Sequence, residues 1–370
     1  MKVGILTYHR SVNYGAYLQA YCLQILLSER TGYDVEIIDY DSKSAAEYYK
    51  GQFFHRGVRG MIYNIRRHLM FTDFRRNLPL SKDSLVTDDI DAFNEFIENR
   101  YDLIVVGSDE VWNVSGFRPF PNAYWLPKIK GVRKVTYAIS GRNRICDLTD
   151  DTKDKIKIYI DEFEFITVRD GISKKLIDGF LPEGKESSVV CDPTMAYDFS
   201  FDREVGRRLI REKFHVDPGK KVIAIMDSTG DIIRNLNEDI DVQFISLYSY
   251  YPGLKNNPNI KPEEWVQIIA ASDGLITAFY HGMCIALSSN IPFLFCEERD
   301  IESNEFSKGY DLLHRYEMED HYIRCSNPGL RTTENDFINK IKSGFCKEDF
   351  DGIRKAEKAK FDIFVEYLKA

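Results

Sequence analysis

The feature that most constrains this chain is the alternation of short apolar, β-rich runs with stretches of helical periodicity along most of its length. This pattern is typical of α/β units, in which a helix follows each strand of a parallel sheet. We therefore expect an α/β protein. The runs that predict strands cover residues 3–8, 35–39, 103–106, 135–139, 165–168, 189–191, 222–226, 244–247, 275–278 and 292–295.

The length of 370 residues fits two domains of this kind, at roughly 150 residues per domain. We expect a Rossmann-like domain over residues 1–195 and a second one over residues 196–370. Residues 203–214 predict a helix that ends before a Pro-Gly turn. An apolar stripe with helical spacing over residues 347–369 predicts a terminal helix, which we assign to the second domain.

Composition excludes several classes of protein. The chain has 50 Lys and Arg against 58 Asp and Glu, a net charge of −8, so its overall field does not favour nucleic acid. No apolar run reaches the roughly 18 residues of a membrane span, and the N-terminal residues enter a strand rather than a secretory signal. We therefore expect a cytoplasmic protein.

The seven cysteines are odd in number and widely scattered, without a C-x-x-C pair. Most lie among apolar residues, so we expect buried, reduced thiols rather than a disulfide framework or a metal site. No set of metal ligands and no dinucleotide fingerprint of the G-x-G-x-x-G type is present, and we predict neither a metal nor a cofactor.

One stretch departs from the global charge balance. Within a helical insertion expected at about residues 43–80, residues 50–77 carry seven basic side chains and the single acid Asp73, with apolar residues interleaved. Charge runs most often only solvate a helix that covers its domain. The alternatives are peripheral contact with an anionic membrane at its inner face, or attraction of an anionic substrate.

A first candidate site follows the strand at residues 3–8. The turn Asn13-Tyr14-Gly15-Ala16 leads into a helix-like stretch that contains Gln19. A tight turn into a helix places amide groups and the positive end of the helix dipole at the edge of the sheet where ligands bind. An ordinary strand-to-helix turn explains the same residues.

A second candidate site follows the strand at residues 103–106. Gly107 allows a tight turn, so that Ser108, Asp109 and Glu110 emerge at the same edge, close to Trp112. Two acids, a hydroxyl and an indole at a strand end suit the recognition of hydroxyl groups. Helix capping by Ser108 or Asp109 is the structural alternative.

A third candidate site is His281, which follows the strand at residues 275–278 and precedes a short helix predicted at residues 283–289. A histidine at a helix N-terminus suits the binding of a phosphate or the movement of a proton near neutral pH. A structural role with satisfied hydrogen bonds is the alternative.

Together these motifs resemble the polysaccharide pyruvyl transferase family. The resemblance extends in order from residue 3 to about residue 325. It is carried by Asn13-Tyr14-Gly15-Ala16, Leu18-Gln19-Ala20, Gly107-Ser108-Asp109-Glu110-Val111-Trp112-Asn113, Thr136-Tyr137-Ala138-Ile139-Ser140, Val168-Arg169-Asp170, Cys191-Asp192-Pro193-Thr194 and Tyr280-His281-Gly282.

The resemblance implies two facing Rossmann-like domains, as in glycosyltransferases of the GT-B type. It also implies transfer of a pyruvyl group from phosphoenolpyruvate, the co-substrate, to two hydroxyls of a free or lipid-linked saccharide in surface polysaccharide biosynthesis. No metal is needed for the resulting ketal. The resemblance carries over to His281, to Gly107, Ser108 and Asp109, and to Arg169. Together with the residues singled out above, it leads us to expect catalytic roles for His281 and Asp109, donor binding by Gly282, Tyr280, Arg169 and Arg142, and acceptor binding by Asn13, Tyr14, Gly15, Gln19, Ser108, Glu110 and Trp112.

One departure from the family pattern weakens the expectation of phosphoenolpyruvate as donor. Many members carry an arginine two residues before the histidine and others a serine, whereas this chain has Phe279. The donor charge would then need another cation, for which Arg142, Arg144, Arg169 and Arg299 are candidates. The alternatives are a nucleotide-sugar glycosyltransferase, or a catalytically inactive glycan-binding protein that uses the tyrosine-rich run Tyr248-Ser249-Tyr250-Tyr251.

Overall fold

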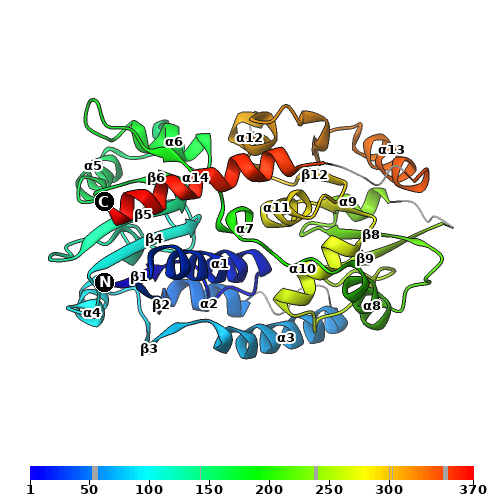
Figure 1. Ribbon diagram of the computed structural model, residues 1–370, viewed down its shortest axis with the longest axis horizontal. Coiled ribbons are helices and arrows are strands. Elements are labelled where there is room, and N and C mark those ends of the chain that lie inside the picture. The colour runs from blue at the N-terminus through cyan, green and yellow to red at the C-terminus, as the bar shows by residue number, and fades with distance from the viewer. Residues whose placement is uncertain (52–56, 142, 237–240, 300, 302, 345–348) are drawn as a thin grey trace. The chain divides into compact units, whose positions relative to one another are not determined.

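The computed structural model describes residues 1–370 except 52–56, 142, 237–240, 300, 302 and 345–348. It contains two parallel sheets with helices between the strands (Figure 1). The first sheet has the order β3-β2-β1-β4-β5-β6-β7, with β1 (Lys2–Leu6), β2 (Asp34–Asp41), β3 (Leu80–Val86), β4 (Leu103–Asp109), β5 (Arg133–Ile139), β6 (Thr167–Val168) and β7 (Ser188–Val189).

The second sheet repeats this topology. Its order is β10-β9-β8-β11-β12-β13, so in both sheets the strand order reverses next to the first strand, at β1/β4 and at β8/β11. Ligands of parallel α/β sheets bind outside the carboxyl ends of the strands at such a reversal. The strands are β8 (Lys221–Met226), β9 (Val242–Ser246), β10 (Lys255–Asn256), β11 (Gly274–Thr277), β12 (Phe293–Glu297) and β13 (Tyr322–Arg324).

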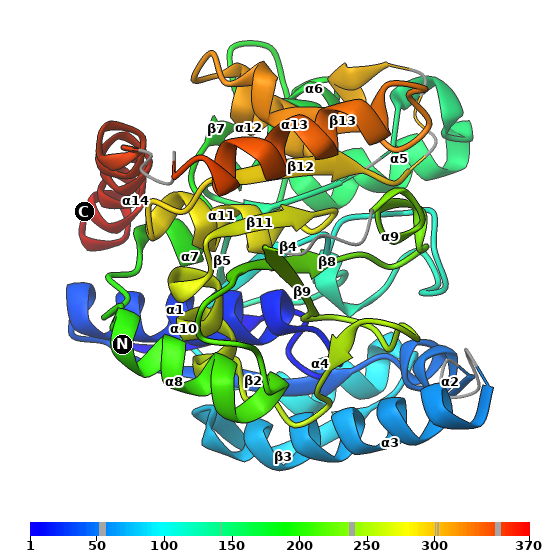
Figure 2. The ribbon, with the colours of Figure 1, turned by 90° about the vertical axis from the view of Figure 1, so that its right-hand side faces the viewer.

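Fourteen described helices accompany the strands, and Figure 2 shows α13 beside β13. They are α1 (Tyr14–Thr31), α2 (Lys43–Gly51), α3 (Gly57–Phe74), α4 (Ile90–Ile97), α5 (Asp150–Ile160), α6 (Gly171–Asp178), α7 (Pro193–Ala196), α8 (Arg203–Phe214), α9 (Asp231–Asn235), α10 (Pro262–Ala271), α11 (Tyr280–Ser288), α12 (Lys308–His314), α13 (Leu330–Lys342) and α14 (Asp351–Lys369).

The central strands are buried on both faces, which explains their nearly unbroken apolar sequence. In β4, Ile104 and Val106 belong to a core that also contains Phe93 of α4 and Ile156 of α5. Successive side chains of a strand point to opposite faces. Leu103 and Val105 of the same strand therefore lie on the other face, and they are buried as well.

The chain divides into two compact units whose members are not contiguous in sequence. The first unit comprises residues 1–52, 75–197 and 357–370, and the second comprises residues 53–74 and 198–356. The division after residue 197 lies close to the expected boundary, but two segments differ from the expectation. Helix α3, expected in the first domain, belongs to the second unit, and most of α14, expected in the second domain, belongs to the first.

The ten strands expected from the sequence each overlap an observed strand, in β7 by a single residue, whereas β3, β10 and β13 were not expected. Strand β3 has the largely polar sequence LSKDSLV and pairs with β2 at the edge of its sheet. An edge strand exposes one side to solvent, and therefore lacks the apolar run by which the central strands are recognised. Strands β10 and β13 have only two and three residues.

The cysteine prediction holds for four of the six cysteines that the structure describes. Cys22, Cys191, Cys284 and Cys296 are buried, whereas Cys146 is exposed, and all six described cysteines are free thiols. Cys346 lies outside the described residues.

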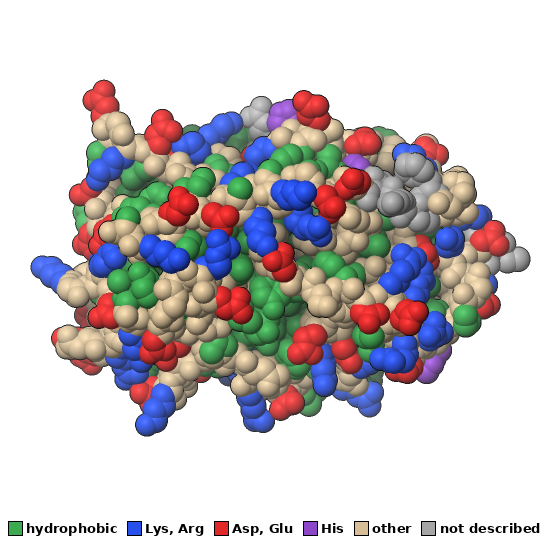
Figure 3. Space-filling model, viewed as in Figure 1, with side chains coloured by type: hydrophobic (Ala, Val, Ile, Leu, Met, Phe, Trp, Pro, Cys, Tyr) green, Lys and Arg blue, Asp and Glu red, His purple; other side chains and the backbone are tan. Residues whose placement is uncertain are grey.

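The surface shows no large field of one sign on the face seen in Figure 3. Basic and acidic side chains are interspersed over most of its described part. In the described ranges, no helix is both long enough and apolar enough to serve as a membrane span.

Candidate functional site

The first candidate site lies at the carboxyl ends of β1 and β4. The Thr7 hydroxyl, which follows β1, donates a 2.8 Å hydrogen bond to the carbonyl oxygen of Ser108 in β4. The two strands are thereby joined at the reversal of strand order. The residues that the sequence singled out after these strands therefore do lie at one edge of the sheet.

The residues at the start of α1 mainly stabilise the structure. The Asn13 side chain caps the helix by accepting from the amide of Gly15 at 2.8 Å, and Tyr14 and Gly15 are buried. Buried Gln19 donates to the Thr7 hydroxyl at 2.9 Å and accepts from the Ser108 hydroxyl at 2.8 Å. These residues hold α1, β1 and β4 together, and of the expected acceptor ligands at this turn only Asn13 is partly exposed.

The end of β4 presents two carboxylates. Gly107 has φ +111°, and a Cβ there would lie 2.3 Å from the carbonyl oxygen of Tyr137, so only glycine fits. Asp109 has φ +84°, a strained value for a non-glycine residue, and its carboxylate accepts from the Glu110 amide at 2.8 Å. Both Asp109 and Glu110 are half-buried and can contact a ligand.

Trp112 corrects the expectation of an aromatic ligand at this strand end. Its ring is fully buried, stacks on Trp125 with 4.5 Å between centroids, and donates from Nε1 to the carbonyl oxygen of Tyr124 at 2.9 Å. The indole packs into the core, because its large apolar surface gains more from burial than from exposure at the edge.

Arg169 is likewise a buried structural residue in the first unit rather than an exposed donor ligand. Its side chain is inaccessible to solvent and donates to Asp192 at 2.8 Å, and a guanidinium nitrogen lies 3.7 Å from the Asp109 carboxylate. A buried arginine must have a carboxylate partner, and the partner here comes from the Asp-Pro-Thr motif. Arg169 therefore supports the position of Asp109.

Several polar residues at this edge were missed by sequence reasoning. His9 and Arg10 both donate to the Asp39 carboxylate at 2.8 Å. Burial alone would raise the pKa of Asp39, but these hydrogen bonds outweigh it and lower the pKa. Arg118 lies 3.8 Å from the centroid of the Tyr8 ring. His9, Arg10 and Arg118 come from segments between strands that carry no recognisable motif, so only the fold brings them to this edge.

The second candidate site lies at the carboxyl ends of β8 and β11, where α11 begins. The N-cap residue Phe279 has no side chain that can accept from the amides of the first turn. His281 lies in this turn, is 9% exposed, and meets Tyr280 edge-on with 5.8 Å between ring centroids. An uncapped helix start beside a histidine suits an anionic group.

Packing explains, at least in part, why a tyrosine and a glycine occupy positions Tyr280 and Gly282. Tyr280 is 4% exposed. A Cβ at Gly282 would lie 2.8 Å from both Met226 Sδ and Thr277 Oγ1, so glycine lets α11 approach the strands closely. Arg142, the remaining expected donor ligand, lies outside the described residues.

Two carboxyl groups also lie at this edge of the second sheet. Buried Asp227 follows β8 and accepts from the amides of Gly230 and Ile233 at 2.6 and 3.0 Å. Glu298 follows β12 and accepts from the Ser228 amide at 2.8 Å. Burial, together with the hydrogen bond to Asp227, raises the pKa of Glu298 to about 7. Glu298 can therefore carry a proton near neutral pH.

Of the cations expected to compensate the donor charge, Arg299 is the one that lies in the described part of the second unit. Arg299 is bound by both carboxylate oxygens of Glu297, at 2.8 and 2.7 Å. The ring of Phe279 packs against Tyr248 at 4.0 Å, and Arg67 of α3 lies 4.5 Å from the Tyr248 ring. Lys308 lies 5.4 Å from the ring of Tyr280. In the described part of the second unit, Arg67 and Lys308 are thus the cations packed on the aromatic residues at this helix start.

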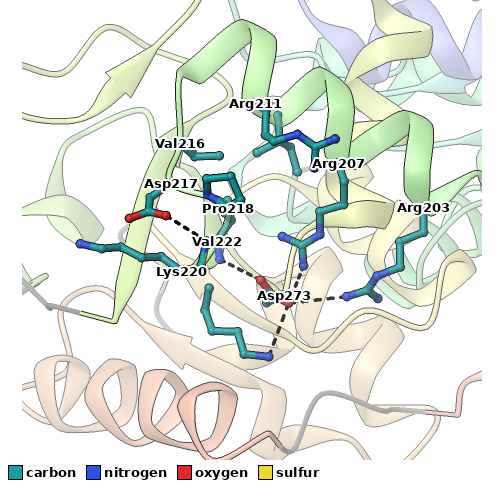
Figure 4. A pocket seen from close by; sticks show the side chains of 12 residues that line it. Arg203, Arg207, Arg211, Val216, Asp217, Pro218, Lys220, Val222 and Asp273 are labelled. Carbon is teal, nitrogen blue, oxygen red and sulfur yellow. Dashed lines mark hydrogen bonds and ion pairs between the residues drawn. The ribbon is translucent and has the colours of Figure 1, made fainter.

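A basic pocket of about 350 Å³ in the second unit lies at the opposite edge of its sheet (Figure 4). Asp273 precedes β11 and pairs with Arg207 at 2.6 Å, Arg203 at 3.6 Å and Lys221 at 3.8 Å. The buried carboxylate thus already neutralises much of this charge. Because ligands of parallel sheets bind at the carboxyl edge, we do not assign the active site to this pocket.

Comparison with known proteins identifies the class. A family model described as polysaccharide pyruvyl transferase matches residues 13–299, and the chain belongs to this family. No curated protein matches the sequence.

Solved structures show the fold. S. aureus MnaA, in a co-structure with UDP, is 11% identical with a TM-score of 0.55, over 91% of this chain and 88% of its own. The UDP-GlcNAc 2-epimerase from Methanocaldococcus jannaschii is 12% identical with a TM-score of 0.53, over 92% of both chains. The chain thus has a GT-B-like fold with two parallel α/β sheets and a C-terminal helix.

Proposed function

We propose that this protein transfers a pyruvyl group from phosphoenolpyruvate to two hydroxyls of a saccharide, forming a ketal in surface polysaccharide biosynthesis. The observation that carries the proposal is His281 in the first turn of α11, at the reversal of strand order and within the matched region of the family. The acceptor is a saccharide, free or lipid-linked, that the enzyme meets in the cytoplasm.

The reaction requires two proton movements. C3 of the enol gains a proton, while the two hydroxyl oxygens bond to C2 and lose their protons. The C2–oxygen bond to phosphate breaks, and one of the released protons leaves with the phosphate. His281 is suited to donating to C3 or to the phosphate, and the Asp109 carboxylate to accepting a proton from a hydroxyl.

The charge of phosphoenolpyruvate needs compensation near His281. The first-turn amides of α11 supply part of it through the helix dipole. Lys308 and Arg67, which pack on the neighbouring aromatic rings, are the described cations suited to supply the rest. In this proposal they supply the positive charge that many family members carry as an arginine at the position of Phe279.

The test is release of inorganic phosphate from phosphoenolpyruvate in the presence of a panel of saccharide acceptors. Turnover is expected from the native chain and not from His281→Ala. His314→Ala is a matched control, because His314 is exposed and pairs with Glu319 in another part of the second unit. Failure of the native chain to bind phosphoenolpyruvate at millimolar concentration would overturn the proposal.

A nucleotide-sugar glycosyltransferase is a second candidate, favoured by the same uncapped start of α11, which also suits a diphosphate. A thermal-shift screen separates the two, because a true donor raises the melting temperature in proportion to ln(1 + [L]/Kd).

The packing of Phe279 on Tyr248 favours a third candidate, a glycan-binding protein without catalysis. This candidate predicts saccharide binding without stabilisation by either donor.

A further inference from the structure

The Arg118 side chain in the first unit lies among aromatic rings and has no carboxylate partner among the described residues. Its guanidinium carbon is 3.8 Å from the centroid of the Tyr8 ring and 4.7 Å from that of Phe117. Its Nε is buried and finds no hydrogen-bond acceptor in the described ranges. By contrast, Arg100, which also lies over an aromatic ring, pairs with Asp83 at 3.0 Å.

The surroundings of Arg118 are those of a ligand site. Tyr8 follows β1, and its hydroxyl donates to the carbonyl oxygen of Glu110 at 3.2 Å, so the guanidinium lies at the edge that carries the candidate carboxylates. Phe117 stacks on Tyr48 with 4.1 Å between centroids, and 45% of Tyr48 is exposed. Flat rings beside carboxylates offer a surface on which a sugar ring can lie.

Asp41 acts on Arg118 through its charge alone, because no hydrogen bond or ion pair joins the two side chains in the described structure. Burial raises the pKa of Asp41, and the positive charge of Arg118 only partly opposes this rise. A guanidinium without a carboxylate partner has its planar fork of donors available for an oxyanion.

We propose that the Arg118 guanidinium, held over the rings of Tyr8 and Phe117, binds an anionic group of the saccharide acceptor. The group is a phosphate or a carboxylate, which a guanidinium can bind through two parallel hydrogen bonds. The assignment to the acceptor rests on the proposed function, but binding can be measured without turnover.

Calorimetric titration of the full chain with glucose, glucuronate, glucose 1-phosphate, inorganic phosphate and phosphoenolpyruvate tests this assignment. In Arg118→Gln, the Kd of glucuronate or glucose 1-phosphate should rise about tenfold or more, whereas the Kd of glucose should not change. In Arg118→Lys, the Kd of the anionic sugars should lie between the values of the native chain and of Arg118→Gln, because lysine keeps the charge and loses the planar fork. Arg100→Gln is the matched control and should leave all Kd values unchanged.

Three results overturn the assignment. The first is absence of binding of both anionic sugars to the native chain, and the second is an unchanged Kd for both in Arg118→Gln. The third is a loss of affinity in Arg118→Gln that is confined to phosphoenolpyruvate, which would assign the bound anion to the donor. If Arg118→Gln does not fold, the Kd of the anionic sugars in Arg118→Lys alone tests the assignment, and an unchanged value overturns it. Binding of anionic sugars without phosphate release would overturn the proposed function and leave the Arg118 site intact.

A second inference comes independently from α3, which is apolar on two opposite faces. One face is buried and contains Tyr63 and Arg67, which donate to the carbonyl oxygens of Asn257 and Tyr248 at 3.4 and 2.7 Å. The other face exposes four large apolar side chains, out of nine exposed in the described chain. They are Val58 at 69%, Ile62 at 44%, Ile65 at 41% and Leu69 at 61%.

These four side chains form a narrow stripe. At the spacing of an α-helix they fall within an arc of about 60°, opposite the buried face. Exposed Arg59 and Arg66 flank the stripe on one side, and the only acid in α3 is Asp73 in its last turn. A basic helix with an exposed apolar stripe has the pattern of a helix that lies in the interface of an anionic membrane.

We propose that the outer face of α3, defined as Val58, Arg59, Ile62, Ile65, Arg66 and Leu69, docks on an anionic phospholipid surface. Flotation of the full chain with phosphatidylcholine vesicles, with and without phosphatidylglycerol, tests it. Binding is expected only with phosphatidylglycerol. It should fall about tenfold or more in Ile62→Ser/Leu69→Ser, because two apolar side chains no longer enter the interface.

The matched control is Ile158→Ser/Ile363→Ser, which removes two exposed isoleucines on other helices and should not change binding. Arg59→Gln/Arg66→Gln should reduce binding to the anionic vesicles. Equal binding to neutral vesicles, or no binding at all, overturns the inference. So does self-association of the native chain that Ile62→Ser/Leu69→Ser abolishes, because the outer face would then join two copies of the chain.

Discussion

A guanidinium nitrogen of Arg169 donates a 2.8 Å hydrogen bond to Oδ2 of Asp192, and neither side chain is accessible to solvent. The two residues belong to separate sequence motifs, which follow strands β6 and β7. A second guanidinium nitrogen lies 3.7 Å from Asp109. The pair therefore connects two motifs of the family to the carboxylate at the end of β4.

Arg169→Met should lower the free energy of unfolding by about 3–5 kcal/mol, because it leaves the Asp192 carboxylate buried without its cation. Urea denaturation followed by circular dichroism measures this change. Arg133→Met is the control and should lower the free energy by less than about 1 kcal/mol, since its pair with Glu164 is exposed. Equal effects of the two substitutions would contradict the structural role of Arg169.

Asp109→Asn should lower kcat by about 10²-fold to 10⁴-fold without a comparable loss of stability, if Asp109 is the base that accepts a hydroxyl proton. Asparagine tolerates the positive φ of this position, so the strand end should keep its shape. The phosphate-release assay measures kcat. Glu110→Gln is the matched comparison, and a larger loss in that variant would transfer the role of base to Glu110.

Gly282→Ala should destabilise the protein by about 1–3 kcal/mol, because the added methyl group overlaps Met226 and Thr277. Thermal unfolding without ligand measures this effect. Gly352→Ala is a suitable control, since the space around that helical glycine is open. Unchanged stability with weakened donor binding would instead show that Gly282 serves the ligand.

Two carboxyl groups, that of buried Glu334 and that of half-buried Glu298, predict that the free energy of unfolding decreases as the pH rises above 4.5. Burial raises the pKa of Glu334 from 4.5 to about 8, and burial with the Asp227 hydrogen bond raises that of Glu298 to about 7. The folded state therefore holds protons that the unfolded state releases. The contribution of these groups is complete below pH 4.5 and is lost as the pH rises through 7 and 8.

Glu334→Gln and Glu298→Gln should each flatten this dependence, because an amide stays neutral at every pH. Urea denaturation between pH 5 and about 9 measures the slope, which is expected to be less negative in both variants. Glu319→Gln is the control, since the Glu319 side chain is 41% exposed and pairs with His314. A slope in Glu334→Gln equal to that of the native chain would show that Glu334 is ionised in the fold.

The sequence alone determined the class of fold and the sheet edges at which polar turns follow the strands. Apolar runs that are buried on both faces are a local signal, and the polar turns after β1, β4 and β11 lie next to them in sequence. Gly107 could likewise be recognised, because a tight turn depends on its own backbone.

Only the tertiary structure decided which of these residues are accessible to a ligand. Trp112 and Arg169 stand at strand ends in the sequence, yet both are buried, because their partners Trp125 and Asp192 come from other parts of the chain. The free fork of Arg118 was likewise hidden in sequence, whereas the basic, partly apolar character of α3 was visible there and the structure showed which of its faces is exposed. A sequence pattern records local periodicity, whereas burial and ion pairing depend on contacts between distant segments, which only the folded chain brings together.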